Sequence, residues 1–103
     1  MRAMTDVEIE TVLRGEPEWR LQDGKLVRTW TFADFVKAME FVSKIAALAE
    51  EAGHHPDIDI RYNKVTLGLV SHDAGGVTER DAKMAARISR EFAPNADQSG
   101  VAG

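Results

Sequence analysis

The residues of this chain best suited to proton chemistry are its three histidines, His54, His55 and His72. Histidine has an unperturbed pKa of about 6.5, so it can give and take protons near neutral pH. Three histidines within one segment of hairpin size predict a site for general acid and base catalysis. The alternative is a chance group of exposed or helix-capping residues, and spacing alone does not decide between the two interpretations.

His54 and His55 follow a predicted helix end, and Pro56 follows them. The negative end of a helix dipole favours a protonated imidazole, which suits a helix cap and a general acid equally. Pro56 favours an extended conformation at His55, and successive extended residues point in opposite directions. We therefore expect the two histidines to have different roles. This geometry also argues against a metal site, as does the absence of cysteine and of a His-x-x-x-His pair.

The position of His72 depends on a predicted hairpin. Residues 57–62 and 65–70 have the pattern of two strands joined by the turn Asn63-Lys64. Pairing Tyr62 with Val65 across that turn sends the strands back alongside each other. In that register His72 ends close to His55, and a register slip would separate them.

Two carboxylates have spacings that suit a supporting role. Glu50 lies one helical turn before His54 and could accept a hydrogen bond from its imidazole, although a solvated glutamate at a helix end is the simpler interpretation. Asp81 lies three residues after Thr78, which is the spacing of a capping box. Asp81 could therefore do no more than bond the Thr78 backbone.

The elements that position these residues follow from periodicity and turn signals. Helices are predicted over 5–14, over 32–52 with Gly53 at the end, and from Thr78 onward. A first hairpin is predicted over 19–22 and 25–32, around Asp23-Gly24. The predicted order is α-β-β-α-β-β-α. This order indicates an α+β fold, a four-stranded antiparallel sheet with three helices packed on one face, whose open edges favour self-association.

Length and composition limit the classes of function. With 103 residues, of which 44% are hydrophobic and 29% charged, the chain suits one domain, which we place at residues 1–93. Residues 94–103 have the composition of a disordered tail. A net charge of -4 argues against nucleic acid as a partner. No segment has the pattern of a signal peptide or a membrane span, so we expect a cytoplasmic protein without a membrane partner.

Taken together, these residues resemble a family pattern. The spacing of Glu50, His54-His55-Pro56, Tyr62, His72 and Asp81 is similar to that of the pterin-4a-carbinolamine dehydratases. The segment HHPDIDIRYNKVTLGLVSHDAGGVTERD is especially similar to bacterial members. The resemblance covers about residues 19–92. A match over this many spaced positions is far more specific than any single motif.

The resemblance implies the same α+β fold, assembled into homodimers or homotetramers. It implies loss of water from a 4a-hydroxytetrahydropterin substrate to give quinonoid dihydropterin, in tetrahydropterin recycling, with no metal or organic cofactor. Within the implied site, His54 and His72 are the acid and base groups near the 4a-hydroxyl. Glu50 orients His54, and Asp81 supports the surroundings of His72. The implied substrate contacts are His55, which is also counted with the catalytic histidines, and Pro56, Tyr62 and Ser71.

Two alternatives remain open on the same fold. Some members of the family act as non-catalytic interaction proteins, either as dimerisation cofactors of a transcription factor or as assembly factors. A pure scaffold would not need three histidines with Glu50 and Asp81 in register, which favours the enzyme. The second alternative is an enzyme acting on a different pterin, such as one linked to molybdenum-cofactor or folate metabolism.

Overall fold

The predicted helices and strands are present in a computed structural model, which describes residues 1–92. The α+β fold and the order α-β-β-α-β-β-α are confirmed, with one further short 3-10 helix. The expected disordered tail over 94–103 lies outside the described residues. The elements are α1 (Asp6–Gly15), β1 (Arg20–Gln22), β2 (Lys25–Thr31), α2 (Phe35–Ala52), β3 (Asp57–Arg61), β4 (Lys64–Leu69), η1 (His72–Ala74) and α3 (Glu79–Glu91).

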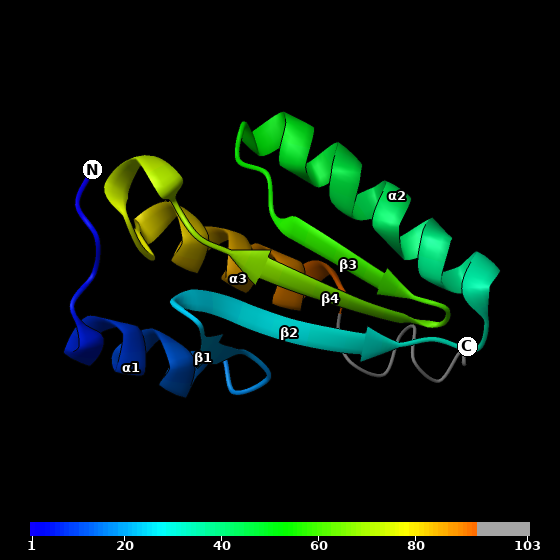
Figure 1. The fold of residues 1–103 in the computed structure, drawn as a ribbon, viewed down its shortest axis with the longest axis horizontal. Helices are drawn as coiled ribbons and strands as arrows, with labels where there is room; N and C mark the ends of the chain where they lie inside the picture. The colour runs from blue at the N-terminus through cyan, green and yellow to red at the C-terminus, as the bar shows by residue number, and fades with distance from the viewer. Residues whose placement is uncertain (93–103) are drawn as a thin grey trace.

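The sheet has the strand order β1-β2-β4-β3 with every neighbouring pair antiparallel (Figure 1). Its core face is formed by alternate residues of the two central strands, such as Trp30 of β2 and Leu67 of β4, which are almost fully buried. The helices cover this face, and residues from all three, including Ile9, Ile45 and Ile88, join the same apolar core. One edge of the sheet is β3, whose five residues are all exposed.

Local signals set where several elements begin and end. Thr5 and Glu8 form the predicted capping box at the start of α1. Asp23 and Gly24 both have positive φ, as the predicted tight turn between β1 and β2 requires. Gly53 ends α2 in the left-handed conformation, with a φ of 66°. This last turn carries the chain directly into the two adjacent histidines.

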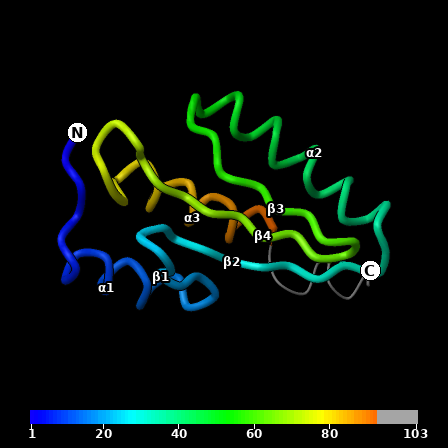
Figure 2. Tube along the Cα trace, viewed as in Figure 1, coloured from blue at the N-terminus to red at the C-terminus, as the bar shows by residue number. Residues whose placement is uncertain are grey.

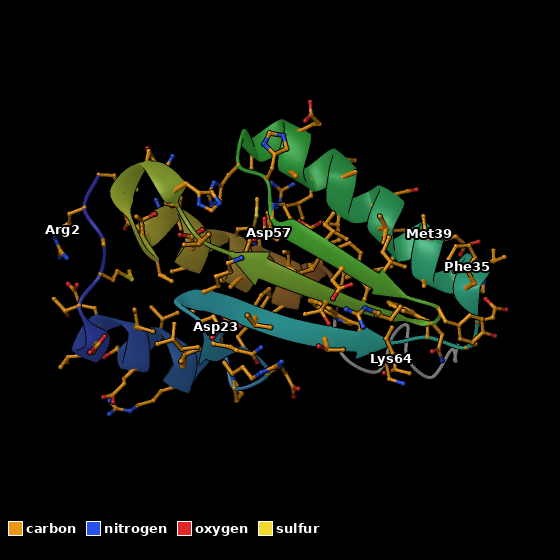
Figure 3. All side chains as sticks on the ribbon, in the orientation of Figure 1. Arg2, Asp23, Phe35, Met39, Asp57 and Lys64 are labelled. Atoms are coloured by element: carbon orange, nitrogen blue, oxygen red, sulfur yellow. The ribbon has the colours of Figure 1, made fainter. Side chains whose placement is uncertain are left out.

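The buried face of α2 differs from the predicted one. Ile45 and Ala49 are buried as expected, whereas Phe35 is 48% exposed and Ala46 is also exposed. Figure 3 labels Phe35 and Met39 on the N-terminal half of this helix. The helix is apolar on more than one side, so several stripes fit the three- and four-residue spacing. The residues that the core selects are Ala38, Phe41, Ile45, Leu48 and Ala49.

The register of the β3–β4 hairpin also differs from the predicted one. Arg61 pairs with Lys64, so the turn consists of Tyr62 and Asn63, and Tyr62 takes a positive φ of 54°. The predicted pairing of Tyr62 with Val65 is wrong by two residues. A shift of two preserves the face on which each side chain lies, because side chains alternate along a strand. It changes only which residues lie opposite one another.

The corrected register changes what meets at the far end of the hairpin. Ile58 lies opposite Leu67, whereas the predicted register placed it near Leu69. Extended past the ends of both strands, the observed register puts His54, and not Pro56, level with Ser71. The residue level with Ser71 therefore lies two positions earlier in the chain than the sequence indicated.

Candidate active site

Three segments meet at the end of the hairpin that lies away from its turn. His54 precedes β3, Ser71 follows β4, and Thr78 caps the start of α3. The N-terminal segment passes the loop after η1, where the Met4 N–H donates to the Val77 carbonyl at 2.7 Å (Figure 2). This end of the sheet is thus built from four stretches that are distant in sequence.

Asp81 is the centre of a buried hydrogen-bond network here. Its side chain is fully buried, and Oδ1 accepts from Nε2 of His54 at 2.6 Å. Oδ2 accepts from the backbone N–H of Thr78 and from the Ser71 hydroxyl, each at 2.9 Å. The predicted capping box is present, so the capping interpretation of Asp81 is confirmed through Oδ2, while Oδ1 is the oxygen that bonds His54.

The contact with Asp81 decides how His54 can exchange protons. An ionised carboxylate can only accept, so Nε2 of His54 bears the hydrogen in this pair. Nδ1 is then the ring nitrogen that takes up or releases a proton. When it takes up a proton, the buried carboxylate balances the positive charge across a charge-assisted hydrogen bond. The His54 side chain is 13% exposed, so its ring is held firmly yet remains reachable.

The carboxylate partners of the histidines differ in the structure from those that the resemblance implies. Glu50 accepts a hydrogen bond from Nε2 of His55 at 2.6 Å, and both side chains are largely exposed. Asp81 bonds His54, and within residues 1–92 it forms no hydrogen bond with His72. Helical spacing favoured Glu50 with His54, but the left-handed turn at Gly53 takes His54 out of the helix. His54 therefore no longer lies on the face of α2 that bears Glu50.

His72 lies at the same end of the hairpin as the other two histidines. It starts η1, is exposed, and directly follows Ser71. Within the described part of the chain it forms no hydrogen bond with His54 or His55. The hairpin thus brings all three histidines to one end of the sheet, and the predicted closeness of His72 to His55 stays a prediction.

The remaining predicted substrate contacts divide into three cases. Pro56 stays beside His55 and is half-buried. Ser71 is 2% exposed and its hydroxyl bonds Thr78 and Asp81, so it supports the site from beneath. Tyr62 lies in the turn at the opposite end of the hairpin, beyond the whole length of β3, which is roughly 15 Å at the usual strand rise. Figure 3 marks these two ends by Asp57 and Lys64. The structure does not bring Tyr62 to the histidines of the same chain.

A cavity of about 230 Å³ lies beside His54, between the end of α2 and α3. Its lining contains Leu48 and Ala52 of α2, together with a row of residues from α3. That row was not recognised from the sequence, although its spacing of three and four residues is the signal for one face of a helix. The row consists of Arg80, Lys83, Met84 and Arg87.

Residues 1–92 contain neither a metal-binding cluster nor a membrane-spanning helix. No group of three histidine, aspartate or glutamate side chains is arranged to hold a metal ion there. No helix in that range has both the length and the apolar character needed to cross a membrane.

Comparison with known proteins gives consistent matches. The family model of the pterin 4 alpha carbinolamine dehydratases matches residues 2–91. A protein of Acidobacterium capsulatum, provisionally named a pterin-4-alpha-carbinolamine dehydratase, is 57% identical over 88 residues, covering 85% of this chain and 96% of its own. A protein of the same provisional name from Chloroflexus aurantiacus is 51% identical, covering 85% and 95%.

Two solved structures share the fold. One is a transcriptional coactivator/pterin dehydratase from Brucella melitensis, with a TM-score of 0.79 and 35% identity, covering 86% of this chain and 97% of the other. The second is a pterin dehydratase-like protein identified as a RuBisCO assembly factor in the alpha-carboxysome. It has a TM-score of 0.59 and 29% identity, covering 71% and 87%.

Proposed function

The chain belongs to the pterin 4 alpha carbinolamine dehydratase family, and from that premise we propose that it removes water from a 4a-hydroxytetrahydropterin to give quinonoid dihydropterin. The observation that carries the proposal is the hydrogen bond between His54 and the fully buried Asp81. It holds a largely buried imidazole with one nitrogen fixed and the other available for proton exchange. An imidazole held in this way can serve as one of the acid or base groups that a dehydration needs.

The reaction requires two proton movements. The carbon–oxygen bond at C4a breaks, and the departing hydroxyl takes a proton so that it leaves as water. A ring nitrogen loses its proton, and its electron pair completes the new carbon–nitrogen double bond. One general acid and one general base therefore suffice, and no electrons are exchanged with another molecule.

We assign the proton transfers to His54 and His72. His54 acts through Nδ1, with Asp81 as the residue that positions it and balances its charge. His72 is exposed at the same end of the hairpin and provides the second group. His55, held by Glu50 at the surface, binds the pterin ring with Pro56. Ser71 supports Asp81 through a hydrogen bond. We propose this role for Ser71 in place of the substrate contact that the resemblance implies.

The exposed edge of the sheet supports self-association. Ile58 and Ile60 of β3 are 37% and 36% exposed, and the outer edge of β3 has no neighbouring strand among the described residues. An unpaired edge with apolar side chains is readily covered by a second copy of the same strand. We propose a homodimer or homotetramer, which light scattering of the purified protein tests directly.

One assay distinguishes the dehydratase proposal from the alternative of a non-catalytic interaction protein. A 4a-hydroxytetrahydropterin is generated in solution, and its dehydration is followed by ultraviolet absorbance with and without the protein. The proposal expects acceleration in proportion to protein concentration. The similarity to an assembly factor at 29% identity gives the non-catalytic alternative its support. No acceleration above the spontaneous rate would favour that alternative.

A further inference from the structure

We propose that the cavity beside His54 binds an anionic substituent of the pterin, and that Lys83 and Arg80 recognise its charge. The inference rests on the proposed function, since it names the substrate class of the same site. Its basis is the make-up of the cavity, where an apolar floor is bordered by cationic side chains and by the active-site imidazole.

The size of the cavity indicates a subsite. Its volume of about 230 Å³ is below the roughly 300–1,000 Å³ of cavities that enclose a drug-sized ligand. It therefore takes part of a ligand, and His54 at its border joins it to the histidines. A pterin whose ring lies against the histidines would direct its substituent along α3.

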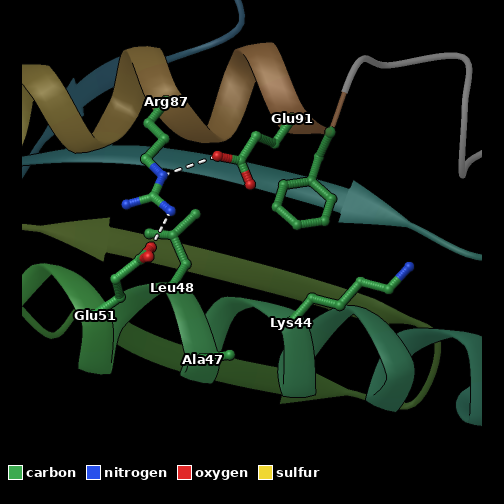
Figure 4. Close-up of a pocket in the computed structure, with 7 residues that line it drawn as sticks. Lys44, Ala47, Leu48, Glu51, Arg87 and Glu91 are labelled. Atoms are coloured by element: carbon green, nitrogen blue, oxygen red, sulfur yellow. Dashed lines mark hydrogen bonds and ion pairs between the residues drawn. The ribbon is translucent and has the colours of Figure 1, made fainter.

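The charges around the cavity are unequal. Arg80, Lys83 and Arg87 line it, and no acidic residue is part of the lining. Arg87 is occupied on its far side, where it bonds Glu51 of α2 and Glu91 of α3 in the neighbouring groove (Figure 4). Its charge is thus largely balanced within the protein.

The charge of Lys83 is not balanced by a neighbouring carboxylate among the described residues. It is exposed, and within residues 1–92 its ammonium forms neither a hydrogen bond nor an ion pair. Lysine is a compact cation whose three N–H donors suit a phosphate or carboxylate. It lies one helical turn after Arg80 and one before Arg87, on the face of α3 that borders the cavity.

Arg80 supplies the second donor. One of its terminal nitrogens bonds Asp73 at 2.6 Å, and this contact holds the pKa of Asp73 below its usual value. Its Nε is buried without a hydrogen-bond acceptor among the described residues. A buried N–H without a partner is unfavourable, and a ligand oxygen would satisfy it after a small rotation of the side chain. Both donors would then converge on one anionic group.

A pair of probes that differ only in charge tests the inference. We would measure the dissociation constants of 7,8-dihydroneopterin and of its monophosphate by titration calorimetry. The phosphorylated probe should bind wild type about 10-fold more tightly at low salt, and the preference should shrink as salt screens the contact. A third probe, 7,8-dihydrofolate, asks whether a carboxylate is recognised as well as a phosphate.

Matched variants locate the effect. Lys83→Gln should reduce the preference for phosphate to less than about 3-fold, because it removes the unbalanced charge. Lys64→Gln removes the same charge from an exposed lysine at the far end of the hairpin, and should leave the preference unchanged.

The outcomes separate the two proposals. Equal binding of the charged and uncharged probes, or a preference that survives in Lys83→Gln, would overturn the anionic subsite and leave the dehydratase proposal standing. Failure of wild type to bind any of the pterins would overturn both.

Discussion

Nε2 of His54 lies 2.6 Å from Oδ1 of Asp81, although the two residues are 27 positions apart and belong to different segments of the fold. The same carboxylate closes the capping box of α3 through its other oxygen. The His54 imidazole is therefore fixed to a helix N-terminus, where the helix dipole also favours the carboxylate's negative charge. A single buried side chain joins the stability of the fold to the geometry of the site.

Ser71→Ala should affect stability more than substrate binding. The Ser71 hydroxyl is buried and bonds both Thr78 and Asp81, so its loss removes a donor from a buried carboxylate. We expect the free energy of unfolding to fall by about 1–2 kcal/mol, with KM for the pterin unchanged. Urea denaturation and steady-state kinetics measure the two effects. A rise in KM with unchanged stability would return Ser71 to the role of a substrate contact.

Glu50→Gln should affect substrate binding more than stability. The ion pair of Glu50 with His55 is exposed, and such pairs contribute little because water and salt screen them. We expect a change in unfolding free energy of less than about 0.5 kcal/mol, together with a higher KM if His55 loses its orientation. Ser71→Ala in the same denaturation series is the reference. A loss of stability as large as that of Ser71→Ala would mean that the pair has a structural role.

Tyr62→Gly tests the corrected hairpin. Tyr62 has a φ of 54°, a conformation that costs an ordinary residue roughly 1–2 kcal/mol and glycine very little. Glycine also raises the entropy of the unfolded chain, by about 0.4–1 kcal/mol. Stability should therefore be unchanged or rise by up to about 1 kcal/mol, and KM should stay as in wild type. A marked rise in KM would mean that Tyr62 reaches the pterin after all, through a second copy of the chain.

The capping box of α1 should make stability depend on pH in acid. The Arg2 guanidinium, first, and the Thr5 backbone lower the pKa of Glu8 from 4.5 to about 2. A lowered folded-state pKa contributes stability that is complete above 4.5 and is lost as the pH falls towards 2. Thermal melts over this range should show a smaller loss for Glu8→Gln than for wild type. Glu10→Gln, on the same helix but outside the capping box, should follow wild type, and identical profiles for all three would contradict the assignment.

The parts of the fold that the sequence predicted are those set by local chemistry. The capping box of Thr5 and Glu8, the Asp23-Gly24 turn and the helix end at Gly53 each depend on residues within a few positions of one another. Such signals act before tertiary packing and are legible in one chain. They were sufficient to order the elements and to place all three histidines at one end of a hairpin.

The sequence predictions that were wrong concern features that only tertiary packing decides. The buried face of α2 had several stripes of suitable spacing, and only packing against the sheet selects one. The β3–β4 register depends on Tyr62 adopting a conformation that its side chain disfavours. The sequence pattern therefore favoured a turn one residue later, at Asn63-Lys64. The absence of the expected pair between Glu50 and His54 follows from one left-handed residue, Gly53, which takes His54 off the helical face where spacing had placed it.

The most direct test of the account is the dehydration rate of His54→Gln at the pH optimum of wild type. Glutamine keeps a donor for Asp81 but cannot exchange a proton, so the fold should persist while general acid–base catalysis is lost. We predict a fall in kcat of about 10²–10⁴-fold with a circular dichroism melt close to that of wild type. A His54→Gln protein that dehydrates the pterin at the wild-type rate would contradict the central claim that His54, held by Asp81, moves the proton.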